Sequence, residues 1–322
     1  MSKKVLVTGG SGFLGSALVE GLVRRGYKVR VFDDNSRGNL RRLQKVVDEV
    51  EFVEGDIRDG AAVDAATKGM DWVFHLAFVN GTRHFYEMPE LVLDVGIRGA
   101  LTTMDAAMKH HVERYIVASS SEVYQEPKHI PTPEAERIII PDINNPRFSY
   151  SGGKIITELL TLHYLRGISQ RIIFRPHNLY GPDMGWEHVI PDFMRRIRET
   201  THTAKNGRLP FSIQGTGHET RAFCYIEDAV EGILLCSEKG QDGEIYHLGV
   251  DEEIDIAGLA TKIGQIAGYD LALQAQPLRA GGTSRRCPDI SKLRSLGYVP
   301  KVNLEEGLRF TYDWYSKTDE LK

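Results

Sequence analysis

Runs of apolar residues rich in valine, isoleucine and phenylalanine alternate with stretches of helical periodicity along the first half of the chain. Such near-continuous apolar runs are typical of strands covered on both faces of a parallel sheet. We expect strands over residues 4–8, 28–33, 51–54, 72–77, 114–119 and 171–175. Between them, apolar side chains recur at helical spacing over residues 13–23 and 101–108. The pattern therefore predicts an α/β fold in which helices connect parallel strands.

The rhythm of the chain changes after about residue 176. Prolines such as Pro182 and Pro191 punctuate shorter segments there, which predicts a second, smaller domain. Earlier in the chain, residues 126–148 are rich in proline and show little periodicity. We expect that stretch to form a long ordered loop near a functional site.

Composition and charge exclude several classes of protein. The 322 residues are 41% hydrophobic and 26% charged, which is ordinary for a globular protein. The net charge of −4 offers no basic excess for nucleic acid, and no apolar run has the length of a signal peptide core or a membrane span. Neither the three cysteines nor the scattered histidines have metal-ligand spacing. We expect a cytoplasmic protein with no metal, no nucleic-acid partner and no membrane partner.

A glycine-rich turn, Thr8-Gly9-Gly10-Ser11-Gly12-Phe13-Leu14-Gly15, follows the first expected strand and opens a helix. Gly9 permits a tight turn, and Gly12 lets the backbone approach a pyrophosphate. Gly15 lets the helix pack closely on the sheet, and the helix N-terminus supplies free N–H donors. We therefore expect the turn, with Phe13 and Leu14, to bind a dinucleotide.

The residues after the second and third strands suggest which dinucleotide binds. Asp33 ends the second strand, where a carboxylate can bind both adenosine ribose hydroxyls and repel a 2′-phosphate. NAD is therefore favoured over NADP, although Arg37 lies close behind and offers a charge for that phosphate. Asp56 and Ile57 are candidates for the adenine edge, and an exposed turn aspartate is the alternative.

Tyr150 and Lys154 lie one helical turn apart at the start of a periodic stretch, so they share one face of a helix. A free tyrosine has a pKa near 10, and a role as base near neutral pH needs a depression of roughly three units. A lysine ammonium and an oxidised nicotinamide can provide it. The pair alone is a common accident, but with the glycine turn it predicts an acid–base site.

Further motifs accompany the glycine turn and Tyr150-x-x-x-Lys154. They are Ser119-Ser120-Ser121-Glu122-Val123-Tyr124, His75-Leu76-Ala77, Arg175-Pro176-His177-Asn178-Leu179-Tyr180-Gly181-Pro182, Gly215-Thr216-Gly217-x-x-x-Arg221-x-Phe223-x-Tyr225-x-x-Asp228, Tyr246-His247-Leu248-Gly249 and Leu296-Gly297-Tyr298-x-Pro300. With them, nearly the whole chain resembles the extended short-chain dehydrogenase/reductase family of NAD-dependent nucleotide-sugar epimerases and dehydratases.

The resemblance implies a Rossmann-type doubly wound parallel sheet with a smaller mixed α/β substrate domain. It assigns residues 1–176, plus roughly 220–250, to NAD binding, and residues 177–219 and 251–322 to binding of a nucleoside-diphosphate sugar. It also implies a homodimer through the helix that bears Tyr150 and Lys154, with Leu159, Leu160 and Leu162.

The resemblance also implies roles for individual residues. Ser120 hydrogen-bonds the sugar oxygen that is oxidised, Tyr150 removes its proton, and Lys154 holds the nicotinamide ribose. Ser119 and Ser121 are alternatives to Ser120, and Ser121 is a further substrate contact. The remaining assignments are Leu76 and Ala77 to the cofactor, and Asn178, Arg221 and Arg279 to the nucleotide diphosphate. For Arg279 the alternative is a solvated basic patch with Arg285 and Arg286.

Some positions depart from the pattern of the family. Relatives usually have asparagine, threonine and asparagine where this chain has Asp94, Ala100 and Thr102, so contacts under the nicotinamide are expected to differ. His177 stands where an apolar residue is common. It is either a packed histidine or a contact to the substrate beside Asn178.

Glu122 bears on the outcome of the reaction. Simple C4 epimerases of the family need only the serine, tyrosine and lysine, whereas 4,6-dehydratases and uronate decarboxylases carry a glutamate here. We expect epimerisation, with a 4,6-dehydratase, a uronate decarboxylase using Glu122, or a net nucleotide-sugar 4-dehydrogenase as alternatives. A non-catalytic NAD-binding regulator is a different class, against which the intact Ser120, Tyr150 and Lys154 argue.

Overall fold

A seven-stranded parallel sheet is the centre of the computed structural model, which describes residues 2–204, 208–277 and 283–318. Its strands are, in spatial order, β11 (Glu244–Leu248), β6 (Gln170–Pro176), β5 (Arg114–Ala118), β4 (Trp72–His75), β1 (Lys4–Thr8), β2 (Lys28–Asp33) and β3 (Val50–Glu54). The order reverses between β1 and β4, where ligands bind in such sheets. The predicted doubly wound Rossmann-type sheet is confirmed.

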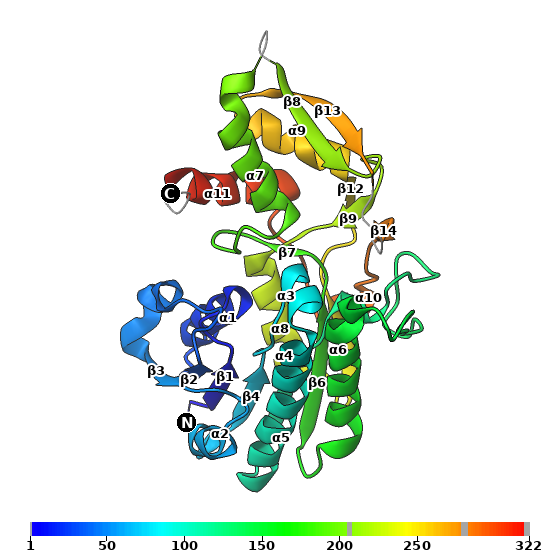
Figure 1. Ribbon diagram of the computed structural model, residues 1–322. Helices are drawn as coiled ribbons and strands as arrows, with labels where there is room; N and C mark the ends of the chain where they lie inside the picture. Colours follow the sequence, from blue (N-terminus) through cyan, green and yellow to red (C-terminus); the bar gives the residue numbers. More distant parts are fainter. Residues whose placement is uncertain (1, 205–207, 278–282, 319–322) are drawn as a thin grey trace.

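Successive residues of the strands point to opposite faces of the sheet, and the buried ones are apolar on both faces. Helices therefore cover both faces. One face packs against α1 (Phe13–Arg24), η1 (Leu40–Glu49), α8 (Ile226–Lys239) and α10 (Ser291–Ser295). The other face packs against α2 (Gly60–Thr67), α5 (Gly99–Lys109) and η5 (Leu160–Tyr164), the π-helical continuation of α6 (Ser149–Leu159). Figure 1 shows α5 and α6 running side by side next to β6.

A smaller part of the molecule lies beyond the carboxyl ends of the strands, at the top of Figure 1. Its own apolar core joins α7 (Val189–Thr200), α9 (Ile256–Ile266) and α11 (Leu304–Lys317) to the parallel pair β8 (Arg208–Gln214) and β13 (Asp270–Gln276). Short strands lie between the two parts: β7 (Leu179–Tyr180) with β10 (Cys224–Tyr225), and β12 (Glu253–Asp255) with β9 (Thr220–Ala222) and β14 (Arg285–Arg286). The domain boundaries themselves stay a prediction.

Two strands end earlier than the sequence predicts, because the chain turns into the cleft at their carboxyl ends. β4 ends at His75 and β5 at Ala118, so Leu76, Ala77 and Ser119 lie just beyond the sheet. Five of the remaining elements follow that edge: α3 (Thr82–Glu87), α4 (Pro89–Leu93), the π-helix η2 (Asp94–Arg98), η3 (Ser121–Val123) and η4 (Pro146–Phe148). The last, η6 (Thr201–Thr203), continues α7 in the smaller part of the molecule.

The predicted loop over 126–148 has no helix or strand before η4. Within the part of the chain that the structure describes, no helix combines the length and apolarity needed to cross a membrane.

A buried carboxylate at the start of α8 links the two parts of the molecule. Asp228 is 3% exposed, and its two oxygens accept the backbone N–H groups of Lys301 and Val302 at 2.8 and 3.0 Å. These bonds fix the segment that leads into α11. A buried carboxylate with such partners is expensive to remove because two backbone donors lose their acceptor at once.

We expect Asp228→Ala to lower the free energy of unfolding by about 1 to 3 kcal/mol, measured by urea denaturation. Glu227 gives the control, because it lies in the same first helical turn and is exposed. Glu227→Ala should change the free energy by less than about 0.5 kcal/mol. Equal losses in the two variants would contradict the role assigned to Asp228.

Candidate active site

One cleft of about 800 Å³ opens at the carboxyl ends of the central strands. This volume is in the range of sites that enclose a small-molecule ligand. The cleft brings together most of the residues singled out from the sequence: Gly9, Gly12, Phe13, Leu14, Gly15, Asp33, Asp56, Ile57, Leu76, Ala77, Ser120, Ser121, Glu122, Tyr150, Lys154 and Asn178.

The glycine turn between β1 and α1 leaves no room for side chains at two of its positions. Gly9 has a φ of +72°, and a Cβ there would lie 2.7 Å from the backbone nitrogen of Ala77. A Cβ on Gly15 would lie 2.0 Å from the carbonyl oxygen of Gly9. At Gly12, apart from its chain neighbours, the one described atom within 4 Å of a Cβ is the Gly9 carbonyl oxygen at 3.2 Å, and this position lines the cleft. The turn therefore fits a pyrophosphate at the N-terminus of α1.

Asp33 holds this turn against the end of β2. Its carboxylate accepts the backbone N–H groups of Ser11 and Asn35, both at 2.9 Å, and the side chain is buried. Each carboxylate oxygen has a second lone pair, so the same group can also accept a ribose hydroxyl. The geometry fits NAD, because a 2′-phosphate beside this carboxylate would bring two anions together.

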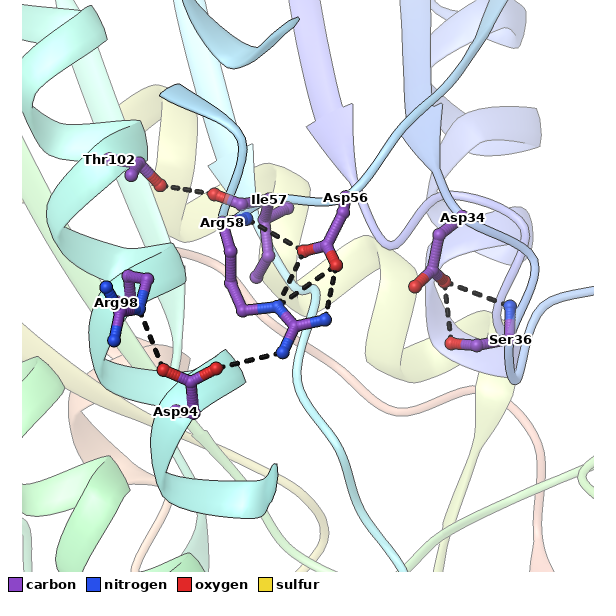
Figure 2. A network of polar contacts seen from close by, with 8 residues as sticks. All are labelled: Asp34, Ser36, Asp56, Ile57, Arg58, Asp94, Arg98 and Thr102. Carbon is purple, nitrogen blue, oxygen red and sulfur yellow. Dashed lines mark hydrogen bonds and ion pairs between the residues drawn. The ribbon is translucent and has the colours of Figure 1, made fainter. Parts of the chain in front are cut away.

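A chain of ion pairs forms the wall of the cleft near Asp56 (Figure 2). Arg58 binds Asp56 through Nε and Nη2, and its Nη1 donates to Asp94 at 2.9 Å. Asp94 also accepts from Nε of Arg98 at 2.7 Å. The hydrogen bonds from Arg58 hold the pKa of Asp56 below its usual value. Asp56 is therefore a fixed anion rather than a solvated turn residue.

The departures from the family pattern contact this same wall. Asp94 takes part in the ion pairs, and the Thr102 hydroxyl donates to the carbonyl oxygen of Ile57 (Figure 2). Ala100 is buried in the core under the sheet. The structure therefore places the changed contacts of Asp94 and Thr102 at the 56–58 segment, which the sequence assigns to adenine.

Tyr150 lies between two aromatic rings beside the end of β5. It stacks on Phe85 with ring centroids 4.8 Å apart and meets Phe78 edge to face at 5.3 Å. Burial raises the pKa of Tyr150 to about 12, and a hydrogen bond with Ser120 opposes this rise. Ser120 caps η3, where its Oγ accepts the backbone N–H of Glu122 at 3.1 Å.

Lys154 lies one turn further along α6, and its Nζ donates to the carbonyl oxygen of Ala118 at 2.7 Å. Burial lowers the pKa of Lys154 to about 7, while Glu158 opposes the shift. Lys154 is not among the groups that shift the pKa of Tyr150 in the absence of the nicotinamide, so the expectation that the two together depress this pKa stays a prediction. Burial dominates both pKa values and favours the neutral form of each group.

Glu122 is held by two arginines. Its Oε1 accepts from Nη1 of Arg286 at 2.6 Å, and its Oε2 lies 3.8 Å from Nη2 of Arg147. Burial raises the pKa of Glu122, but Arg286, Arg147 and Arg221 outweigh it and the net shift is downward. The side chain of Arg286 is only 12% exposed, so the alternative of a solvated patch is wrong for this residue. Sequence reasoning missed Arg147.

Of the residues expected at the nucleotide diphosphate, Asn178 lies in the lining of the cleft and Arg221 does not. Asn178 lines the cleft and donates to the carbonyl oxygen of Ala222 at 3.1 Å. Arg221 is not among the lining residues, and its guanidinium donates to the carbonyl oxygens of Thr220 and Thr283. Arg279 lies outside the described residues.

His177, which precedes Asn178, is buried, and its ring centroid lies 4.6 Å from that of His247. Neither ring nitrogen has a partner within the described ranges. Burial holds the pKa of His177 well below its usual value, so the ring is neutral. Because it does not line the cleft, the packed-histidine interpretation is favoured.

A buried ion pair supports the active-site segments from behind. Arg175 at the end of β6 binds Glu158 on α6 through Nε and Nη2, at 2.8 and 2.6 Å. The hydroxyl of Ser119 also donates to Glu158. Glu158 was not singled out from the sequence, because a glutamate four residues after a lysine is more often a surface helix pair.

The fold and this cleft define a dinucleotide-binding enzyme with a tyrosine and a lysine in the lining of the cleft. A family model described as "NAD dependent epimerase/dehydratase family" matches residues 5–249. The chain belongs to this family, and its cofactor is NAD.

Relatives in the family differ in the reactions for which they are named. A UDP-N-acetyl-alpha-D-glucosaminuronate decarboxylase of Bacillus cytotoxicus is 29% identical over 330 residues, which is 99% of each chain. A UDP-glucose 4-epimerase of Thermotoga maritima, solved with UDP-glucose, has a TM-score of 0.85 at 29% identity and covers 99% of this chain and 100% of its own. A dTDP-glucose 4,6-dehydratase of Streptomyces venezuelae, solved with NAD, has a TM-score of 0.86 at 29% identity with the same coverage.

Asp33→Ala should weaken NAD binding by the cofactor-free protein at least about tenfold, measured by titration calorimetry. The reason is that the turn loses the acceptor for Ser11 and Asn35. Asp34→Ala is the matched control, because among the described residues the Asp34 carboxylate accepts hydrogen bonds from Ser36 and not from the glycine turn. An unchanged affinity in Asp33→Ala would remove Asp33 from the cofactor site.

Proposed function

We propose that the protein modifies a nucleoside-diphosphate sugar by transient oxidation at C4, and that the outcome is epimerisation at C4. The assembly of Ser120, Tyr150 and Lys154 at one end of a dinucleotide cleft supports the oxidation step. The observation that carries the choice of outcome is the ion-paired state of Glu122.

The proposed chemistry follows from the three side chains. Tyr150 takes the proton of the C4 hydroxyl, and Ser120 hydrogen-bonds the same oxygen while the C4–H bond breaks. NAD, when bound, accepts the hydride and returns it. The Lys154 ammonium stabilises the ionised form of Tyr150. Because the hydride returns within one turnover, the reaction consumes no external oxidant, and the cofactor is expected to purify with the protein.

Epimerisation needs no further acid or base. After oxidation, C4 is a planar ketone, and return of hydride to its other face inverts the centre. A carboxylate that removes a proton from the adjacent C5 must be a strong enough base. Glu122 is a weak one, because Arg286 binds it at 2.6 Å and its pKa lies below the usual value. The ion pair therefore supports the outcome that uses only Ser120, Tyr150 and Lys154.

A second outcome, decarboxylation of a uronate, has one observation in its favour. Three arginines, Arg147, Arg221 and Arg286, act on the single carboxylate of Glu122, so the cluster has an excess of positive charge. A sugar carboxylate at C6 would find a counter-ion there. Oxidation at C4 would make it a β-keto acid, which loses carbon dioxide without a strong base.

The test is product analysis with the purified protein and no added NAD. UDP-, dTDP-, GDP- and CDP-sugars, including uronates, are incubated and examined by mass spectrometry and proton NMR. Unchanged mass with altered ring-proton couplings supports epimerisation. Loss of carbon dioxide (about 44 Da) or of water from the substrate would overturn it. Tyr150→Phe should reduce turnover by about 10²- to 10⁴-fold, which separates the activity from a contaminant.

The substitution Glu122→Gln distinguishes the two reaction outcomes by removing the carboxylate from the protein. If the product is an epimer, kcat should stay within about tenfold of wild type, because glutamine keeps the size of the side chain and the reaction needs no proton from it. A larger loss, of about 10²-fold or more, would make Glu122 a working acid–base group and contradict the epimerase proposal.

We also propose a homodimer through α6. Of the three leucines named from the sequence, only Leu159 is exposed, at 51%, while Leu160 and Leu162 pack against the core under the sheet. Ile156 lies one turn before Leu159 on the same outward face and is 37% exposed. An isologous contact between two such faces is the commonest way to form a dimer.

Light scattering should therefore give the mass of a dimer for wild type and of a monomer for Leu159→Glu, because a charge at the centre of an apolar contact is desolvated without a partner. Val299→Glu is the control, since Val299 is 69% exposed and outside α6. A monomeric wild type, or a dimer that survives Leu159→Glu, would disprove this contact.

A further inference from the structure

The ammonium of Lys154 is buried with an aromatic ring as its neighbour instead of a carboxylate. Its Nζ lies 3.9 Å from the ring centroid of Phe78 and 5.8 Å from that of Tyr150. The side chain is 3% exposed, and its hydrogen bond goes to the carbonyl oxygen of Ala118. Among the residues that the structure describes, no acidic side chain forms an ion pair with Lys154.

The ring of Phe78 packs against two glycines that lie on different helices. It lies in the loop between β4 and α3, and its ring tip faces Gly96 in η2 and Gly153 in α6. A Cβ on Gly96 would lie 2.3 Å from Cζ of Phe78, and one on Gly153 would lie 3.0 Å from it. The ring therefore occupies a place that both helices leave open, and its distance to Lys154 is fixed by packing on two sides.

The other titratable groups around Lys154 give it little compensation. Glu158 lies one turn further along α6, but its carboxylate is bound by Arg175 and the Ser119 hydroxyl. His75 on β4 is buried and neutral, with its pKa lowered to about 3, and its Nδ1 hydrogen-bonds Thr8. Tyr150 is neutral in this state. The negative face of the Phe78 ring therefore acts beside the Ala118 carbonyl oxygen and the charge of Glu158 in favouring the ammonium over the amine.

We propose that Phe78 is a positioning residue that holds Lys154 in its charged form beside Tyr150 through a cation–π contact. The importance of this charge rests on the proposed function, in which a lysine ammonium stabilises the ionised Tyr150. The contact itself exists whether or not the reaction is an epimerisation. A leucine at position 78 would fill much of the space but has no π face, so the neutral amine would become more favourable.

The charge of Lys154 can be followed without substrate, by NMR titration of protein labelled with ¹³C at the lysine ε-carbons. The signal of Lys154 is assigned by its absence in Lys154→Met, and equal NAD content is checked by absorbance. For Phe78→Leu, the titration midpoint should fall by about one pH unit relative to wild type. Because leucine fills much of the space and keeps water from the ammonium, loss of the aromatic face lowers the pKa. A rise of the midpoint would contradict the proposal.

Three further variants guard this result against a general loss of structure. Phe78→Tyr keeps an aromatic face and should restore the wild-type midpoint. Phe85→Leu removes the ring stacked on Tyr150, which has no contact with Lys154, and should leave the midpoint unchanged. Gly96→Ala displaces the Phe78 ring without removing it and should lower the Lys154 midpoint. This variant also tests the contact if Phe78→Leu does not fold.

An unshifted midpoint in Phe78→Leu, or the same shift in Phe85→Leu, would overturn the proposal. Where turnover is measurable, Phe78→Leu should lower kcat about tenfold with KM unchanged, because the substrate does not bind Lys154 in the proposed chemistry. A protein without turnover on any nucleotide sugar would disprove the proposed function, yet the titration would still decide the role of Phe78.

Discussion

The ion pair between Arg175 and Glu158 is the interaction on which the geometry of the cleft depends. It joins the end of β6 to α6 with two hydrogen bonds, and the Ser119 hydroxyl adds the end of β5. Breaking such a buried pair by removal of one partner typically costs about 3 to 5 kcal/mol. The three segments that it joins carry Asn178, Ser120 and the pair of Tyr150 and Lys154. The relative positions of these residues are therefore fixed by Arg175 and Glu158, which are buried and do not line the cleft.

Burial disfavours the charged forms of Tyr150 and Lys154. A tyrosine with a pKa of about 12 does not act as a base at neutral pH, and a lysine with a pKa of about 7 is only partly charged. Positive charge and a hydroxyl partner in the same dry space lower the pKa of Tyr150 and favour its ionised form, whereas added positive charge also lowers the pKa of Lys154. Water exclusion, which is unfavourable for the charges in the resting state, then strengthens each contact that the bound molecules make.

The sequence predicts the parts of the site that depend on local geometry. The glycine turn, Asp33 and the spacing of Tyr150 and Lys154 each follow from one strand end or one helical turn, and the structure brings them into one cleft. Arg286, Arg147 and Phe78 could not be assigned in this way. Arg286 meets Glu122 from 164 positions away, and Phe78 reaches Lys154 only because Gly96 on η2 and Gly153 on α6 leave room. Such contacts depend on tertiary packing, which no local pattern records.

The same limit explains why a glutamate after two serines does not by itself name a reaction. The basicity of Glu122 depends on how many positive charges face it, and those charges come from η4, β9 and β14. With Arg286 in contact, the carboxylate is a weak base and an anchor for an arginine. Were a substrate anion to draw Arg286 away, the pKa of Glu122 would rise and proton transfer would become easier. In the proposed chemistry, the outcome of the reaction therefore depends on the balance of charge around position 122, to which the substrate itself contributes.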